Sequence, residues 1–144
     1  MSHSAASAIV GAAALLTLLV LGGCASSQKP QTAAELAAAL QRHGITVVEQ
    51  KPAALPKMQY GRIEEGITLT GENLSVDIIR IEDERTYKAF VGMGAVLGAA
   101  ERKTGERLPL RPDIYSQKPF VIVVRQEPTP GQVKQALDAV LGGQ

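Results

Sequence analysis

Hydrophobic and polar positions are distributed very unevenly along this chain of 144 residues. Between Ala5 and Leu21 no residue is charged and only Ser7 and Thr17 are polar, whereas all 15 basic and 14 acidic residues follow Cys24. Beyond Cys24, stretches with apolar residues at every second position alternate with stretches where they recur every three or four positions. These two periods are typical of strands and helices, so the pattern predicts an apolar leading segment followed by a folded domain.

A first helix is predicted after Thr32. Thr32 and Glu35 have the spacing of a capping box, in which each side chain accepts a hydrogen bond from the other residue's backbone N–H. Leu36 and Leu40 mark its apolar face, and Gly44 ends it.

Strands are expected in three places. Residues 45–49 read as a single strand, and residues 67–70 and 74–78 alternate apolar with polar positions around a short turn, which is a hairpin signal. The alternation fails at residues 78–81, which indicates a bulge or burial on both faces. A second hairpin is predicted from residues 113–115 and 120–124, and the unbroken apolar run of its second strand predicts burial on both faces.

Two further helices complete the pattern. Asp83 is a plausible N-cap for a helix through Tyr87 and Phe90. Thr129 followed by Pro130 predicts the start of a last helix, whose apolar stripe is Val133, Leu137, Val140 and Leu141. Successive hairpins between helices predict an α+β domain: a mostly antiparallel sheet of about five strands with about three helices on one face.

The end of the leading segment reads Leu21-Gly22-Gly23-Cys24 and resembles a bacterial lipobox. In that class a signal peptidase cuts before the cysteine, and the thiol carries a diacylglyceryl group. The resemblance implies a signal peptide over residues 1–23, a lipidated Cys24 with a flexible tether to residue 31, and a single domain over 32–144. The alternatives are an uncleaved membrane helix over residues 5–23, which is just long enough to span, and ordinary secretion.

Cleavage before Cys24 would determine the length of the mature chain, the state of its thiol and the membrane to which it is anchored. Removing 23 residues from 144 leaves 121, one domain's worth. Cys24 is the only cysteine, so a lipidated thiol leaves none for a disulfide. Ala25 follows it, where an Asp would resemble an inner-membrane retention signal. We therefore expect a lipid-anchored protein of the cell envelope, on the periplasmic face of the outer membrane if the organism is Gram-negative.

Three glycines interrupt the apolar residues 90–98. A phosphate-binding loop is not supported, because Leu97 occupies the third glycine position of the Gly-x-Gly-x-x-Gly pattern. Close helix packing, or a helix giving way to a loop, is the favoured interpretation. The alternative is the lining of a small apolar pocket together with Met58. The candidate residues for contact with a ligand or partner in this stretch are Gly92, Met93 and Gly94.

Residues 101–111 carry a modest basic excess and are expected to form a loop. Such a loop could face anionic lipid head groups or an acidic partner, or could simply be solvated. The candidate contact residues are Arg102, Lys103, Arg107 and Arg111.

No catalytic, metal-binding or cofactor-binding constellation is evident in the sequence. His43 is the only histidine after Cys24, and its place in the last turn of a helix suits the helix dipole. The acidic run 82–84 lies at a predicted helix start, where carboxylates complement the same dipole. The near balance of charge and the scarcity of aromatic residues argue against nucleic-acid binding.

The chain beyond Cys24 resembles a family of small, uncharacterised bacterial secreted proteins and lipoproteins. The matching motifs are a helix ending in Gly before a strand (residues 40–47), a Leu-Thr-x-x-Gly-Glu hairpin whose counterpart is 69–74, and Pro112-Asp113-Ile114-Tyr115 before a late apolar strand. The strand at 76–81 lacks the family's tyrosines. The resemblance implies the fold and carries no catalytic residue.

The expected function is therefore a membrane-anchored, non-enzymatic binding module, with the membrane reached through lipid on Cys24 and an envelope protein as partner. A small apolar ligand- or lipid-binding module is the alternative.

Overall fold

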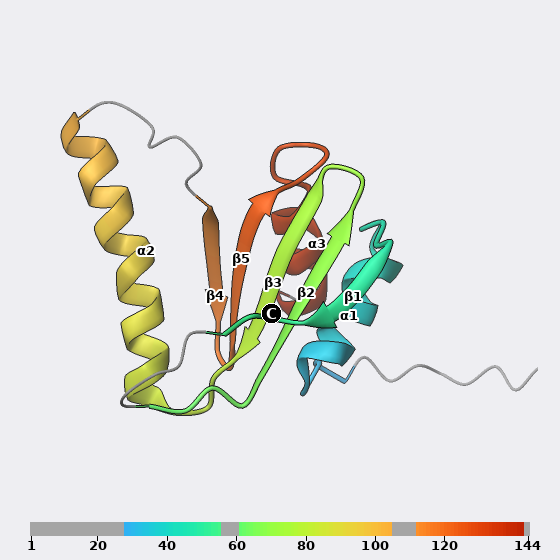
Figure 1. Cartoon of the computed structure of the whole chain (residues 1–144), viewed down its shortest axis with the longest axis horizontal. Helices are drawn as coiled ribbons and strands as arrows, with labels where there is room; N and C mark the ends of the chain where they lie inside the picture. The colour runs from blue at the N-terminus through green and yellow to red at the C-terminus, as the bar shows by residue number, and fades with distance from the viewer. Residues whose placement is uncertain (1–27, 56–60, 105–111, 143–144) are drawn as a thin grey trace, which may run out of the picture.

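The computed structural model describes residues 28–55, 61–104 and 112–142, without the side chains of 95–104. Along the chain its elements are α1 (Ala33–Arg42), β1 (Glu49–Pro52), β2 (Glu65–Gly71), β3 (Leu74–Arg80), α2 (Glu84–Thr104), β4 (Asp113–Gln117), β5 (Phe120–Gln126) and α3 (Gln132–Leu141). The described strands form one antiparallel sheet in the order β1-β2-β3-β5-β4 (Figure 1). The predicted α+β class is confirmed.

Helices cover both faces of this sheet. Successive residues of a strand point to opposite faces, and on β3 Ile78 belongs to the core beneath α1 and α3, whereas Ile79 belongs to the core that contains Phe90 of α2. The expectation that all helices share one face is therefore wrong for α2. Helix α2 covers the opposite face because β3 and β5 bury apolar side chains on both faces, so each face of the sheet needs a covering layer.

The larger core lies under α1 and α3. Leu36 and Leu40 are fully buried, as is Val133 of α3, and they pack against inward positions of β2, β3 and β5. Burying one such side chain stabilises the fold by about 1.5–3 kcal/mol. The apolar stripes predicted for the first and last helices are thereby confirmed, and Val140 is half-buried beside them.

The smaller core lies on the opposite face. Ile79 and Ile81 meet Val121 and Phe90 there, and the segment after β1 crosses the same face to bring Leu55 over β2. A Cβ at Gly66 would lie 2.8 Å from Leu55 Cδ2, so a larger residue at that position of β2 would require the Leu55 side chain to shift. The expected irregularity at residues 78–81 is thus burial on both faces, and the shift in register lies at Ser75/Val76.

The first strand and the last helix start at other residues than predicted. The first strand begins at Glu49 rather than residue 45, because Ile45 turns into the core and its N–H bonds to Leu40 O at the end of α1. The N-cap of α3 is Gly131 rather than Thr129. There the carboxylate of Glu127 accepts the N–H groups of Gly131 (2.5 Å) and Val133 (2.9 Å), a role that the sequence pattern did not suggest.

Candidate functional site

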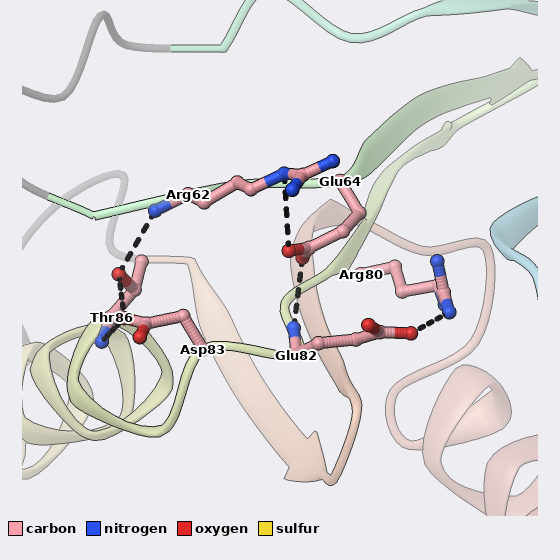
Figure 2. Close-up of polar contacts among 6 residues, drawn as sticks. All are labelled: Arg62, Glu64, Arg80, Glu82, Asp83 and Thr86. Atoms are coloured by element: carbon pink, nitrogen blue, oxygen red, sulfur yellow. Dashed lines mark hydrogen bonds and ion pairs between the residues drawn. The ribbon is translucent and has the colours of Figure 1, made fainter.

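Helix α2 carries all the candidate contact residues that the structure describes, and its amino-terminal end is held by polar contacts (Figure 2). Asp83 caps the helix, since its carboxylate accepts the backbone N–H of Thr86 at 2.7 Å and the Thr86 hydroxyl at 2.5 Å. These two hydrogen bonds, the hydroxyl first, hold the pKa of Asp83 below its ordinary value. The predicted N-cap is confirmed.

Thr86 also joins the helix to the segment before β2. The Thr86 side chain is buried, and its Oγ1 accepts the backbone N–H of Arg62 at 3.3 Å (Figure 2). Gly61 precedes this contact with φ +111°, and a Cβ there would lie 2.1 Å from Thr86 Oγ1. Any residue larger than glycine would therefore push the helix start away from this segment.

Two consecutive glutamates hold the starts of two helices on opposite faces. Glu64 Oε2 accepts the backbone N–H of Glu82, just before the α2 cap, at 2.8 Å (Figure 2). Glu65 Oε2 accepts the backbone N–H of Ala33, the first residue of α1, also at 2.8 Å. Both helices accordingly begin at the same end of the sheet, the lower end in Figure 1.

The acidic run 82–84 is engaged in ion pairs and capping. Glu82 pairs with Arg80, and Glu84 pairs with Lys118 and, at 3.2 Å, with Lys88. Hydrogen bonds from Lys118 and Lys88 lower the pKa of Glu84, and the Glu84 contact raises the pKa of Lys118. Within the described ranges, no group of three or more His, Cys, Asp or Glu side chains is arranged to hold a metal ion.

The middle of α2 has one packed side and one open side. Phe90 is buried, and Gly94 faces β4, where a Cβ at Gly94 would make ordinary van der Waals contact with Ile114 at 3.5 Å. A Cβ at Gly92 would have no neighbour within 4 Å, and Met93 is 53% exposed. The three candidate contact residues thus lie together on a continuous helix, with Gly94 facing β4 and Gly92 bordering open space.

The helix extends further than expected. Residues 101–104 belong to the last turn of α2, so Arg102 and Lys103 lie on a helix rather than on a loop. The reason is local, since Ala99, Ala100 and the charged residues after them are strong helix formers. Arg107, Arg111, Met58 and the lipobox Leu21-Gly22-Gly23-Cys24 lie outside the described residues.

A cavity of about 230 Å³ lies between the edge strand β4 and α3. Its lining combines the apolar side chains of Ile122, Leu137 and Leu141 with the Lys134–Asp138 ion pair (2.6 Å). Burial raises the pKa of Tyr115, which also lines it. The lining residues are Ile114, Tyr115, Ser116, Gln117, Ile122, Lys134, Leu137, Asp138 and Leu141. Sequence reasoning did not find this cavity, because β4 and α3 carry no shared local motif.

Asp77 is a second feature that the sequence did not reveal. Its carboxylate is buried in the middle of the sheet, accepts the Thr68 hydroxyl at 2.8 Å and pairs with Arg125 at 2.6 Å. The pairing raises the pKa of Arg125. Because the charge and its hydrogen-bonding capacity are satisfied, we interpret this cluster as structural.

No family model, curated protein or solved structure matches the chain. None of the helices in the described ranges combines the length and apolar character that crossing a membrane requires.

Proposed function

We propose that this protein is a lipid-anchored component of the bacterial cell envelope whose α+β domain is a non-enzymatic interaction module. The observation that carries the proposal is the Leu21-Gly22-Gly23-Cys24 sequence at the end of a charge-free run. A diacylated cysteine with a further acyl chain would hold the protein on the bilayer with negligible release, since each buried CH₂ contributes about 0.8 kcal/mol. Ala25 favours the periplasmic face of an outer membrane where one exists.

The position of the first capped helix supports anchoring close to the membrane. Thr32 Oγ1 accepts the N–H of Glu35 at 3.1 Å, and Glu35 Oε2 accepts the N–H of Gln31 at 2.7 Å. Cys24 lies eight residues before Thr32. Because an extended chain spans at most about 3.5 Å per residue, the domain would remain within roughly 28 Å of the lipid.

The chemistry of the described residues favours binding over catalysis. Asp83 acts as a helix cap, and Glu82 and Glu84 pair with basic side chains. His43 is the C-cap of α1, where its backbone N–H bonds to Ala39 O and Leu40 O. A hydrolase needs a nucleophile with a base, a paired acid and base, or a metal.

The anchor is tested by the intact mass of membrane-extracted protein beside a Cys24→Ser variant. We expect a chain that begins at Cys24 and carries acyl mass, and an unmodified chain in the variant. A full-length, unmodified wild-type protein would contradict the proposal.

The interaction module is tested by chemical cross-linking in intact cells followed by identification of the bound envelope protein. Met93→Asp places a charge on the open side of α2, and Val48→Asp places one at another exposed apolar position, 79% exposed before β1. We expect a stoichiometric cross-linked partner that Met93→Asp weakens and Val48→Asp retains. Absence of any reproducible partner would count against a protein-binding role.

The β4–α3 cavity favours a second candidate, a small-ligand-binding module. Its volume of about 230 Å³ limits the ligand to a short amphipathic molecule whose polar end would meet Tyr115 or Lys134. Titration with octanoate, followed by NMR, should perturb residues around Leu137, and Leu137→Trp should abolish this by filling the space. Perturbations spread evenly over the surface would dismiss the ligand-binding candidate.

A further inference from the structure

The two edges of the sheet differ in what they offer to a further strand. β1 lies at one edge and β4 at the other (Figure 1). An edge strand exposes a row of backbone N–H and C=O groups, which proteins commonly protect with proline, lysine or a bulge. β1 contains Lys51 and Pro52, and proline has no N–H to donate. β4 contains neither residue type, and its register with β5 is unbroken.

The register shows which backbone groups of β4 point away from the sheet. Ile81 N–H donates to Pro119 O at 2.7 Å, so alternate residues from Pro119 onward bond to β3. The residues between them, which bond to β4, are Phe120, Ile122 and Val124, opposite Gln117, Tyr115 and Asp113. The backbone N–H and C=O groups of Ile114 and Ser116 therefore point outward, and none of the described residues bonds to them.

The β4–α3 cavity lies beside these outward groups. Tyr115 and Gln117 belong to the face that α3 covers, since Tyr115 packs on the larger core and Gln117 Nε2 donates to Leu141 O at 2.8 Å. The side chains of Ile114 and Ser116 point to the other face, where Ile114 packs on the smaller core. Both residues nevertheless line the cavity, so they border it through their backbone. The unpaired edge of β4 and the cavity thus form one groove, the β4–α3 groove.

We propose that the β4–α3 groove binds an extended peptide segment of a partner protein, which adds to β4 as a further antiparallel strand. Two residues of that segment exchange backbone hydrogen bonds with Ile114 and Ser116. The residue between them lies opposite Tyr115 and points its side chain to the α3 face, over the cavity. In this mode of recognition, backbone hydrogen bonds supply affinity and a pocket for an alternate side chain supplies specificity. The inference rests on the proposed interaction module and names its partner's chemistry, at a surface distinct from the open side of α2.

The cavity favours an apolar side chain at that central position. Ile122, Leu137 and Leu141 contribute apolar side chains to its lining, and Lys134 and Asp138 pair with one another at 2.6 Å. A volume of about 230 Å³ accommodates one large aliphatic side chain. A leucine flanked by β-branched residues, which favour extended backbone, is therefore the expected centre of the bound segment.

A second copy of the chain fits the β4–α3 groove less well. If two β4 strands paired antiparallel so that Ile114 of each bonded to Ser116 of the other, each Tyr115 would lie opposite its equivalent. The Tyr115 side chain already packs on the larger core of its own domain, so it is not free to fill the cavity of the other copy. The side chains of an extended peptide carry no such constraint.

The test uses the full-length protein in phosphatidylcholine nanodiscs and a fluorescein-labelled peptide with a central leucine and three threonines on each side. Fluorescence anisotropy should show saturable binding that empty nanodiscs lack. Replacing the leucine by serine should raise the dissociation constant at least about tenfold, because the cavity loses its apolar occupant.

Methylation of the peptide backbone tests the strand pairing. N-Methylation of the two threonines beside the leucine should raise the dissociation constant at least about tenfold, since it removes the N–H groups that the carbonyls of Ile114 and Ser116 accept. N-Methylation of the leucine is the matched control. Its N–H points away from β4, so the dissociation constant should change by less than about threefold.

Proline substitutions at the two edges test the protein side. Ser116→Pro removes an outward N–H and leaves the hydrogen bonds to β5 intact, so it should raise the dissociation constant about tenfold. Ala53 N–H donates to Gly66 O at 3.0 Å, so by alternation the Gln50 N–H points outward from β1. Gln50→Pro is therefore the matched control and should leave binding unchanged. Hydrogen exchange measured by mass spectrometry should slow over residues 112–117 on addition of the leucine peptide and stay unchanged over 49–52.

Several results would overturn the inference. They are no saturable binding, equal binding of the leucine and serine peptides, and dimerisation of the detergent-extracted protein that Ser116→Pro abolishes, as measured by analytical ultracentrifugation. A cross-linked partner in cells that Ser116→Pro does not weaken would also overturn it while leaving the interaction module standing. The peptide measurements use the whole chain whatever its processing at Cys24, so failure of the anchor and failure of strand addition are distinguishable.

Discussion

Glu64 and Glu65, adjacent at the start of β2, hold the beginnings of two helices that lie on opposite faces of the sheet. The Glu64 carboxylate accepts the backbone N–H of Glu82, and the Glu65 carboxylate accepts that of Ala33. Strand alternation explains the arrangement, since consecutive side chains of an extended segment point to opposite faces. The Glu64-Glu65 dipeptide thus links the start of α1, which follows the tether, to the start of α2.

Replacement of Glu65 by Ala should destabilise the domain by about 1–2 kcal/mol, because Ala33 N–H loses a charged acceptor at a helix start. Urea unfolding measures the loss, and faster amide exchange in the first turn of α1 locates it. Glu72→Ala, on the exposed turn between β2 and β3, is the control and should change stability by less than about 0.5 kcal/mol. Equal effects of the two substitutions would contradict this assignment.

Replacing glycine by alanine should change the stability in opposite directions at two positions. Gly61→Ala should destabilise by about 1–3 kcal/mol, since its φ is +111° and its Cβ would overlap Thr86 Oγ1. Gly92→Ala should stabilise by about 0.5–1 kcal/mol, since it adds helix propensity in open space. Thermal unfolding of both variants tests the pair, and a stable Gly61→Ala protein would show that the helix start is not fixed by Thr86.

The Asp77–Arg125 pair should show coupling in a double-mutant cycle. Arg125→Met should cost about 1–2 kcal/mol, because the buried Asp77 carboxylate would keep only the Thr68 hydroxyl as partner while the half-exposed arginine is partly screened. Adding Asp77→Asn removes the stranded charge, so the double variant should lose less than the sum of the single losses. Additive losses, measured by urea unfolding, would argue against a working ion pair.

Acid should weaken the α2 cap. The Thr86 hydroxyl and backbone N–H lower the pKa of Asp83 below its ordinary 3.8. A lowered folded-state pKa means that Asp83 contributes stability above about pH 4 and that this contribution is lost as the pH falls below that value. Asp83→Asn keeps an acceptor without titration, so its stability should fall less than that of the wild type between pH 5 and pH 2.5. Parallel urea-midpoint curves would contradict the capping role.

Local signals in the sequence predicted much of the fold. The Thr32 cap, the hairpin over residues 67–78, the buried run in β5 and the apolar stripe of α3 are each encoded within a few neighbouring residues, and the structure has them where expected. The strand at 45–49 and the Thr129 cap were predicted wrongly, because Ile45 is drawn into the core and Glu127 caps α3 in place of Thr129.

The candidate site was predicted only in part. Gly92, Met93 and Gly94 were selected from an unusual run of glycines, and the run is helical in the structure although glycine disfavours a helix interior. The polar contacts at the base of α2 join Arg62 to Thr86 and Glu64 to Glu82, which are 24 and 18 residues apart, so no local spacing could reveal them. The β4–α3 cavity is hidden for the same reason.

By itself, the sequence determined the α+β class, the caps of α1 and α2 and the charge-free run that ends at Cys24, because these depend on residue type and local spacing. Only the tertiary structure decided which face each helix covers, that Glu64 and Glu65 join both helix starts, and that Asp77 is buried with Arg125. Those outcomes depend on two-sided burial of β3 and β5 and on strand order, and both arise from contacts between residues far apart in the chain.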